Sequence, residues 1–216
     1  DLSTKFDVVG KDHPRLDAVA KVTGRAKYSY DIRFKDLIYA KILRSPHARA
    51  RVKSIDLSKA KAIQGVLYTE AYEGRPVAFA GQEVAGVAAE TEQILDDALR
   101  SIVVEYDVLP CVTTVEDALK EGAPGALEGK NDNVGESGEN GNAGQVEEAH
   151  KQADVVLEAE YRTQVQTHSC LETHGSVSKW ENGKLTVWAS TQATFGVRDQ
   201  MARAFNLKQS DVTVIT

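Results

Sequence analysis

A glycine-rich segment over residues 122–144 divides the chain into two regions of different character. It holds a large share of the 16 glycines, and its only large apolar side chains are Leu127 and Val134. A segment with so little apolar surface cannot offset the conformational entropy that ordering costs, and loops of this length are uncommon inside one compact unit. The sequence therefore predicts an exposed linker between a front region of about 120 residues and a back region of about 70.

The composition excludes several classes of protein. Of the 216 residues, 42% are hydrophobic and 27% are charged, which excludes a disordered or collagen-like chain. A net charge of -6 argues against nucleic acid as the main partner, which would favour a basic face. No run approaches the roughly 18 consecutive apolar residues of a membrane span. Two cysteines, Cys111 and Cys170, are too few for a disulfide framework.

The front region alternates between strand and helix patterns. The small apolar run 84–89 predicts a strand buried on both faces, and Thr91 predicts the N-cap of the helix that follows. Ser58 is the predicted N-cap of a shorter helix within 56–64, which Gly65 would end. This alternation predicts a mixed α/β domain and argues against a sandwich or a bundle. The other predicted strands are 37–44, 51–55, 66–69, 77–80 and 102–108.

The back region is typical of a hairpin system with one helix. Asn182-Gly183, between two apolar runs, predicts a two-residue hairpin turn. Residues 157–165 alternate between apolar and polar, which predicts a strand with one buried face. The apolar face would carry Leu157, Ala159, Tyr161, Thr163 and Val165, the other face Glu158, Glu160, Arg162 and Gln164, and a buried helical stripe Val197, Met201 and Phe205.

A cluster of potential metal ligands lies in residues 168–174. In an extended strand, His168, Cys170, Glu172 and His174 would share one face, and their side chains are of the types that zinc prefers. Same-face neighbours lie about 7 Å apart, so all four cannot converge on one tetrahedral ion. Two of them with outside ligands could bind one. We favour polar packing against a neighbouring domain, and a Cys-His nucleophile pair ranks lower still because no orienting group lies nearby.

A basic run offers a second candidate site. His47, Arg49, Arg51 and Lys53 would form a positive stripe on one face of a strand. Such a stripe could hold an anion or an acidic partner, but a solvated outer face is the favoured interpretation. No glycine-rich phosphate loop of a known pattern is present in the sequence.

Several phrases, taken in order, resemble one family. They are RLDAVAKVTGRAKY at 15–28, LRSPHARA at 43–50, AGQEVAGVAA at 80–89, VEYDVLP at 104–110, and HSCLETH at 168–174 with Trp180 and the later Ser190-Thr191-Gln192. Together they resemble the molybdopterin-binding large subunits of the xanthine dehydrogenase and aldehyde oxidase family, the molybdenum hydroxylases. The resemblance implies an α/β hammerhead domain over 15–121, a linker over 122–144, and the N-terminal portion of a molybdopterin-binding domain over 145–216.

The resemblance also implies a function. Family members use a molybdenum-molybdopterin cofactor to hydroxylate an aldehyde or N-heteroaromatic compound with oxygen from water, and pass electrons to [2Fe-2S] clusters and FAD on partner subunits or domains. Gln192 matches the glutamine that hydrogen-bonds an oxo ligand of molybdenum, whereas His168, Glu172 and His174 receive no catalytic role. The glycine-rich GGGFGGK loop and the catalytic glutamate are absent, so we expect no turnover by this chain alone.

Two hypotheses about the chain therefore remain open. In the first, it assembles with the remaining molybdopterin-binding chain or domain, an iron-sulfur subunit and an FAD subunit. In the second, it is a non-catalytic fragment or interaction module that binds no molybdenum. Because the chain starts at Asp1 and ends on the apolar run 212–215, we expect the natural fold to continue elsewhere. The expected compartment is the cytoplasm, or the periplasm if a leader has been removed.

Overall fold

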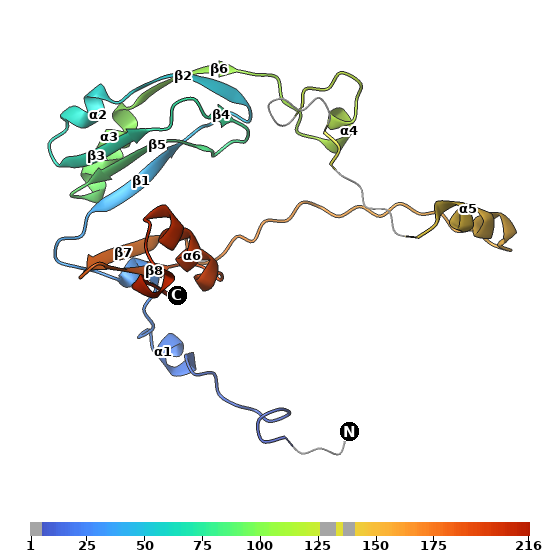
Figure 1. The fold of residues 1–216 in the computed structure, drawn as a ribbon, viewed down its shortest axis with the longest axis horizontal. Coiled ribbons are helices and arrows are strands. Elements are labelled where there is room, and N and C mark those ends of the chain that lie inside the picture. The colour runs from blue at the N-terminus through green and yellow to red at the C-terminus, as the bar shows by residue number, and fades with distance from the viewer. Residues whose placement is uncertain (1–5, 126–132, 136–140) are drawn as a thin grey trace. The chain divides into compact units, whose positions relative to one another are not determined.

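The structure is a computed structural model that describes residues 6–125, 133–135 and 141–216 (Figure 1). The chain divides into two compact units. One comprises residues 36–161, and the other joins residues 1–35 to residues 162–216. Much of the predicted linker, residues 126–132 and 136–140, lies outside the described residues. The domain bounds 15–121, 122–144 and 145–216 stay a prediction.

The unit of residues 36–161 is built around a buried central strand, β5 (Glu83–Ala89). It lies antiparallel between β1 (Tyr39–Arg44) and β3 (Val66–Ala71). The run of small apolar residues allows close packing on both sides, and the prediction of a strand buried on both faces is confirmed. A second sheet has the order β4-β2-β6, with β2 (Ala50–Asp56) between β4 (Pro76–Val77) and β6 (Val103–Val108).

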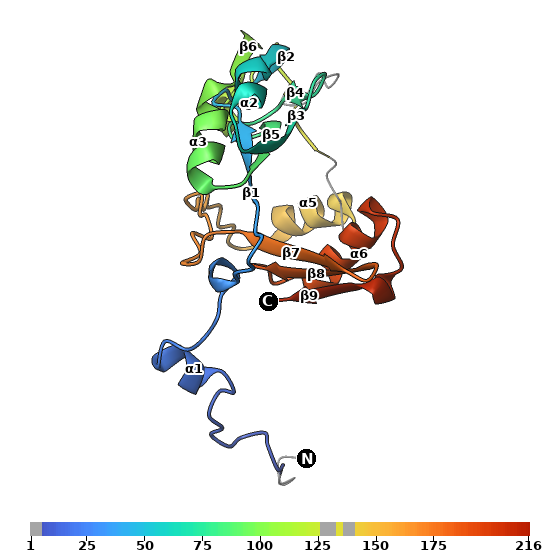
Figure 2. The same cartoon turned by 90° about the vertical axis from the view of Figure 1, so that its left-hand side faces the viewer.

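Alternate residues of β5 serve two clusters. Ala85, Val87 and Ala89 pack with two helices, α2 (Ser58–Ala62) and α3 (Glu92–Ser101). Val84 belongs to the cluster of the second sheet, with Ala50 and Val77. Figure 2 shows α3 beside the strands of this unit. The period of two along the strand therefore places helices on one face of β5 and the second sheet on the other.

The two helix starts differ from each other. Thr91 caps α3 as predicted, because its side chain accepts a hydrogen bond from the Ile94 amide at 3.2 Å. Ser58 is not a cap: its amide donates to the Asp56 carboxylate at 2.8 Å, and it is the first residue of α2. An aspartate two residues earlier competes successfully for this role because its carboxylate is a strong acceptor. The helix ends at Ala62, before the predicted stop at Gly65.

Two further helices follow in this unit. Thr114 caps α4 (Val115–Ala118) by accepting from the Asp117 amide at 3.1 Å. The sequence did not predict α5 (Ala143–Gln152), which Asn142 caps. Every residue of α5 is exposed, so it carries no buried apolar stripe from which a helix could be predicted.

The other unit contains a three-stranded sheet of order β7-β8-β9. The predicted hairpin is confirmed: β7 (Ser176–Glu181) and β8 (Lys184–Ala189) flank Asn182 and Gly183, which have φ values of 50° and 75°. These angles suit a type I′ turn, for which Asn-Gly is the preferred pair. The strand β9 (Val212–Ile215) runs parallel to β8, and α6 (Thr194–Ala204) connects the two. The sequence β8-α6-β9 is therefore a βαβ unit (Figure 2).

The two faces of this sheet are covered differently. Leu185, Val187 and Ala189 pack with Ala202 of α6. On the other face, the ring of Phe34 lies 5.4 Å from the ring of Trp188, centre to centre. The short helices α1 (Ala18–Val22) and η1 (Ser29–Asp31) precede Phe34 in the chain. The predicted stripe on α6 is only partly confirmed, since Val197 and Met201 are half-buried and Phe205 is 52% exposed.

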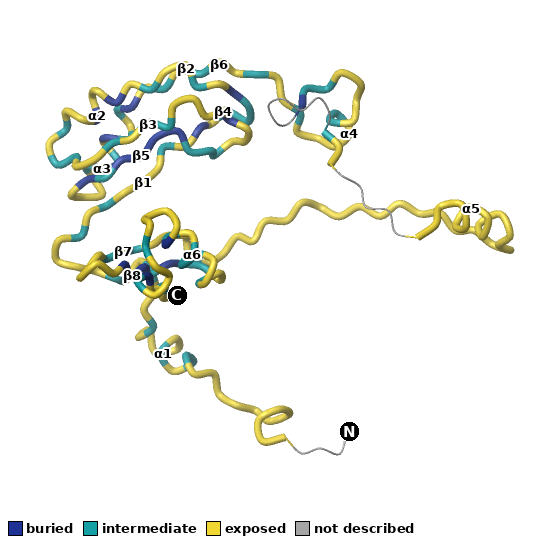
Figure 3. The backbone as a smooth tube through the Cα atoms, in the orientation of Figure 1, coloured by how far each residue is buried: buried dark blue, intermediate teal, exposed yellow. Residues whose placement is uncertain are grey.

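Residues 157–165 do not form the predicted strand. No strand is present between α5 and β7, and each residue of 157–165 is exposed (Figure 3). Strand formation needs a neighbour to complete the backbone hydrogen bonds, and alternation in the sequence does not say whether one exists. Among the described residues, no helix is both long and apolar enough to cross a bilayer.

Candidate functional site

The loop that carries Gln192 lies where β8 ends and α6 begins. Residues 190–193 connect Ala189, the last residue of β8, to Thr194, the first residue of α6. Because β8 and β9 are parallel, their carboxyl ends meet at one edge of the sheet. In open sheets with helical crossovers, ligands bind outside the carboxyl ends of the strands. The fold therefore places Gln192 at the edge where such a site is expected.

Contacts from two other segments hold this loop. The Ser190 amide donates to the Gly175 carbonyl at 3.1 Å, which ties the loop to the residue before β7. The Thr216 hydroxyl donates to the Thr191 carbonyl at 2.9 Å, from the residue that follows β9. His174 lies close by, with its ring Nδ1 at 3.4 Å from the Ser190 carbonyl oxygen. Segments from both sides of β8 therefore fix the backbone around Gln192.

The loop also stabilises its own turn. The Ala193 amide donates to the Thr191 hydroxyl at 3.0 Å. This local bond orders the backbone immediately around Gln192. The Gln192 side chain is exposed, and so is not committed to the core of the unit. A short, anchored backbone with an outward amide side chain is suited to presenting a hydrogen-bond donor.

The electrostatic character of the loop is neutral, with hydrogen-bond donors. No ionisable side chain lies between Lys184 and Arg198 in the sequence. No side chain caps the N-terminus of α6, where Ala193 is the N-cap residue. A helix N-terminus carries partial positive charge and unsatisfied N–H groups. The loop can therefore offer an amide, hydroxyls and backbone N–H groups to the oxygens of a ligand without adding a titrating proton.

The cluster at 168–174 does not form the face that the sequence predicts. The segment is not a strand: Ser169 has a φ of 40°, and the chain bends at Leu171 and Glu172. Glu172 is half-buried, whereas His168, Cys170 and His174 are exposed. Over the described ranges, no three His, Cys, Asp or Glu side chains are grouped so that they could hold a metal ion. The residue brought to the Gln192 loop is His174.

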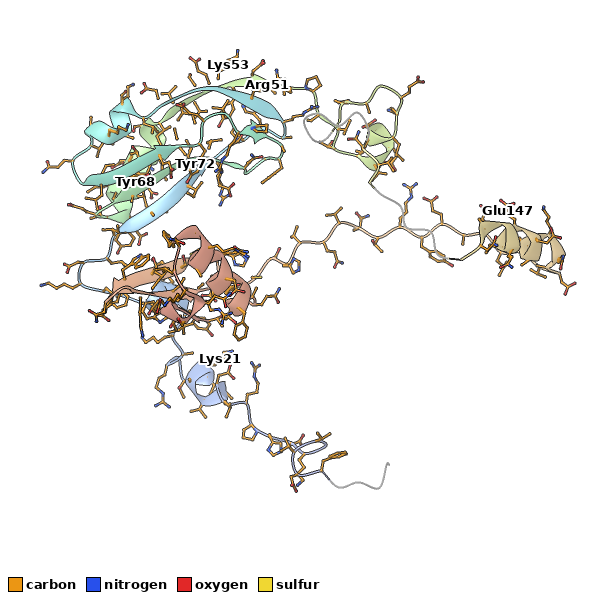
Figure 4. All side chains as sticks on the ribbon, in the orientation of Figure 1. Lys21, Arg51, Lys53, Tyr68, Tyr72 and Glu147 are labelled. Atoms are coloured by element: carbon orange, nitrogen blue, oxygen red, sulfur yellow. The ribbon has the colours of Figure 1, made fainter. Side chains whose placement is uncertain are left out.

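The predicted basic stripe is also broken up. His47 and Arg49 precede most of β2 and are half-buried: the His47 ring lies edge-on to Tyr106, and the Arg49 guanidinium donates to the Pro110 carbonyl at 3.0 Å. Arg51 and Lys53 are exposed on β2 (Figure 4). The neighbouring strand β6 places Asp107 opposite Arg51. An acidic neighbour on the next strand favours the interpretation of a solvated, charge-balanced face.

Two surface hollows lie in the unit of residues 36–161, away from Gln192 in the sequence. One, of about 620 Å³, lies beside α2 and β3, and the acidic residues Asp56, Glu70 and Glu73 help to line it. The other, of about 230 Å³, is lined in part by Arg49 and Cys111. Gln192 lines neither of them. Volume alone therefore does not locate the candidate site, which rests on the geometry of the sheet edge.

Two family models match the chain. Residues 23–74, which include β1, β2 and α2, match the α/β hammerhead domain of aldehyde oxidase and xanthine dehydrogenase. Residues 127–216, which include the Gln192 loop, match the molybdopterin cofactor-binding domain. The chain belongs to the xanthine dehydrogenase and aldehyde oxidase family. The edge of β8 and β9 in this family member thus lies within a cofactor-binding domain.

Curated relatives are longer than this family member. It is 35% identical, over 99% of its length, to the nicotinate dehydrogenase large molybdopterin subunit of Eubacterium barkeri, of which it covers 54%. It is 30% identical, over 97% of its length, to a probable hypoxanthine oxidase of Escherichia coli (strain K12), of which it covers 28%. The chain therefore spans about half or less of the length of these relatives.

Solved structures confirm the fold class. The CO dehydrogenase of Oligotropha carboxidovorans matches with a TM-score of 0.83 and 25% identity, over 96% of this chain and 30% of that one. The aldehyde oxidoreductase of Desulfovibrio gigas matches with a TM-score of 0.78 over 95% of this chain and 26% of that one, and at 21% identity it shows the fold alone. The predicted mixed α/β class, a hammerhead domain followed by the start of a molybdopterin-binding domain, is confirmed.

Sequence reasoning missed the partners of the Gln192 loop. It singled out Gln192 but not Thr216 or Gly175, which anchor the loop. The order of apolar strand, helix and apolar strand over 185–215 carries a signal, because a strand pair joined by a helix is usually parallel. Parallel pairing of β8 and β9 would have predicted that residues 190 and 216 lie at the same edge.

Proposed function

We propose that this chain contributes the hammerhead domain and a cofactor-facing loop to a molybdenum-cofactor oxidoreductase. Its proposed reaction is the hydroxylation of an aldehyde or N-heteroaromatic compound with oxygen from water. The observation that carries the proposal is the position of Gln192, at the carboxyl edge of β8 and β9 within residues that match a molybdopterin cofactor-binding domain. The relatives named for nicotinate and hypoxanthine chemistry support the heteroaromatic class.

The donor set of the loop fits such a cofactor. A molybdopterin group presents oxo and phosphate oxygens, which accept hydrogen bonds from neutral donors and from helix N-termini. The Gln192 side chain, the hydroxyl-bearing residues beside it and the uncapped start of α6 supply donors of these kinds. No carboxylate lies between Lys184 and Arg198 to repel those oxygens. The residues present therefore fit the group.

The roles of the chain's own residues follow from this geometry. The bound cofactor would supply the oxygen-transfer and redox chemistry, since a metal centre can polarise its ligands and accept electrons. Gln192 would hold an oxygen of that group through its amide N–H, a donor that does not change charge as the reaction proceeds. Ser190 and Thr191 would fix the direction of that donor through their backbone contacts with Gly175 and Thr216.

Turnover would also need parts that this chain does not contain. The proposed assembly includes the remaining molybdopterin-binding chain or domain, an iron-sulfur subunit and an FAD subunit, which carry the electrons away. The matched relatives, of which the chain covers 54% or less, support a larger cofactor-binding partner. The cytoplasm is the proposed compartment, with the periplasm as the alternative if a leader is removed.

Native mass spectrometry with molybdenum quantified on the same sample tests the proposal. We expect a complex that contains this chain, a larger second polypeptide region and molybdenum. A lone species near 23.5 kDa without metal would contradict it and favour the non-catalytic fragment or interaction module. Turnover of a panel of aldehydes and N-heteroaromatic compounds by the purified complex then separates the two substrate classes.

A further inference from the structure

Residues 157–165 have the pattern of a strand but no partner strand in the described part of the chain. Leu157, Tyr161 and Val165 occupy alternate positions and are 92%, 90% and 95% exposed. No strand lies anywhere between α5 and β7 (Figure 3). An apolar row of this length, left in water, is unusual for a folded domain and marks an interaction surface.

The composition of this segment differs from that of a linker. The glycine-rich segment 122–144 has few apolar side chains, whereas 153–167 contains four valine or leucine residues and no glycine. Residues 127–216 match a cofactor-binding domain throughout, so the segment lies inside a domain of the family. A domain segment with strict alternation is expected to bury its apolar row against other strands of the same fold.

We propose that residues 157–165 are a docking strand, which pairs with the part of the molybdopterin-binding fold that this chain does not span. This inference rests on the proposed function, since it requires that the rest of that fold be present in the assembly. The length of the relatives supports the assignment, because the chain covers 54% of the nicotinate dehydrogenase subunit and 28% of the hypoxanthine oxidase. Pairing by strand addition would satisfy the backbone and bury the apolar row together.

The pattern defines what the partner strand must offer. Apolar side chains are expected opposite Leu157, Tyr161 and Val165, and polar or basic side chains opposite the face that carries Glu158. A shift of register by one residue would place the apolar row in water, so the pairing register is specified. A docking strand of this kind therefore selects its partner through one face only.

Amide hydrogen exchange on the natural assembly tests the docking strand without any substitution. Exchange at alternate amides of 157–165 is expected to be at least about tenfold slower in the assembly than in the separated chain. Free exchange in an assembly that contains molybdenum would overturn the docking strand and leave the proposed function standing. Equal protection in the separated chain would also overturn it, since the partner would then be this chain itself.

Two adjacent substitutions provide a matched pair. Val165→Asp places a carboxylate on the apolar face, and Gln164→Asp places the same group on the opposite face one residue earlier. We expect Val165→Asp to reduce the recovery of the larger partner about tenfold in native mass spectra, and Gln164→Asp to leave it unchanged. Equal effects of the two substitutions would overturn the assignment of faces.

The remaining outcomes separate the two proposals. Protection of 157–165 by a larger polypeptide in an assembly without molybdenum would support the docking strand and contradict the proposed function. A species of twice the chain's mass, lost on Val165→Asp, would identify a second copy as the occupant and overturn the proposed partner.

Discussion

The hydroxyl of Thr216 donates a hydrogen bond to the carbonyl oxygen of Thr191 at 2.9 Å. This contact joins the end of β9 to the loop at the end of β8, one residue before Gln192. It makes the position of Gln192 depend on the parallel pairing of two strands that lie far apart in the sequence.

Removing this donor should loosen the loop. Thr216→Val keeps the shape of the side chain and lacks the hydroxyl, so we expect the free energy of unfolding of the sheet unit to fall by about 1 kcal/mol and the amides of 190–193 to exchange faster. Thr216→Ser keeps the donor and serves as the control. If valine and serine behave alike by hydrogen exchange, the hydroxyl does not hold the loop.

Gln192 can be tested against a second glutamine on the same segment. Gln192→Leu removes the amide donor, and we expect turnover by the natural assembly to fall about 10²-fold because one preorganised donor is lost. Gln200→Leu makes the same chemical change at an exposed position of α6 and should leave turnover unchanged. Turnover and molybdenum content are measured together. Unchanged turnover for Gln192→Leu would remove this residue from the proposed site.

The hairpin turn depends on backbone conformation and not on space. Gly183 has a φ of 75°, and no atom lies within 4 Å of the place that a Cβ would occupy there. Gly183→Ala should therefore lower the free energy of unfolding by roughly 1–2 kcal/mol through the left-handed conformation alone. Gly175→Ala, at an equally open position without a positive φ, should cost less. Urea unfolding of the two variants decides between conformation and crowding.

Gly86 of the central strand β5 has the opposite constraint. A Cβ at this position would lie 3.1 Å from the Tyr72 hydroxyl oxygen and 3.5 Å from Ile42 Cδ1. Gly86→Ala should destabilise the unit by roughly 1–3 kcal/mol through overpacking. Tyr72→Phe removes the nearest atom, so the double variant should recover part of that loss. A double-mutant cycle of unfolding free energies measures the recovery, and additive effects would place the strain elsewhere.

The start of α2 predicts a dependence of stability on pH. Hydrogen bonds from the Ser58 hydroxyl and amide lower the pKa of Asp56 below its ordinary value of 3.8. Because the carboxylate is favoured in the folded state, its contribution is complete above pH 3.8 and is lost as the pH falls through the lowered folded-state pKa. Thermal unfolding from about pH 6 downward should show a shallower loss for Asp56→Asn than for the unchanged chain. Parallel curves would contradict this role.

Local patterns predicted much of the fold. The hairpin at Asn182-Gly183 and the cap at Thr91 are confirmed because turn and cap geometry depend on neighbouring residues. The buried strand β5 is confirmed because a run of small apolar residues suits burial on both faces. Gln192 was predicted as a cofactor contact from a short motif, and that role stays a prediction.

Other features depended on partners that local patterns do not name. Residues 157–165 carry strict alternation yet form no strand in the described chain, because a strand needs a second strand. Residues 168–174 do not share one face, because the chain bends where a straight strand was assumed. In each case the alternation was present and the pairing was not.

The sequence by itself determined the family, the mixed α/β class and the short elements whose geometry is set within a few residues. Only the tertiary structure decided that β9 lies parallel to β8, and hence that Thr216 and Gly175 hold the loop of Gln192. The physical reason is range: caps and tight turns are stabilised by neighbours along the chain, whereas sheet pairing depends on contacts between distant segments.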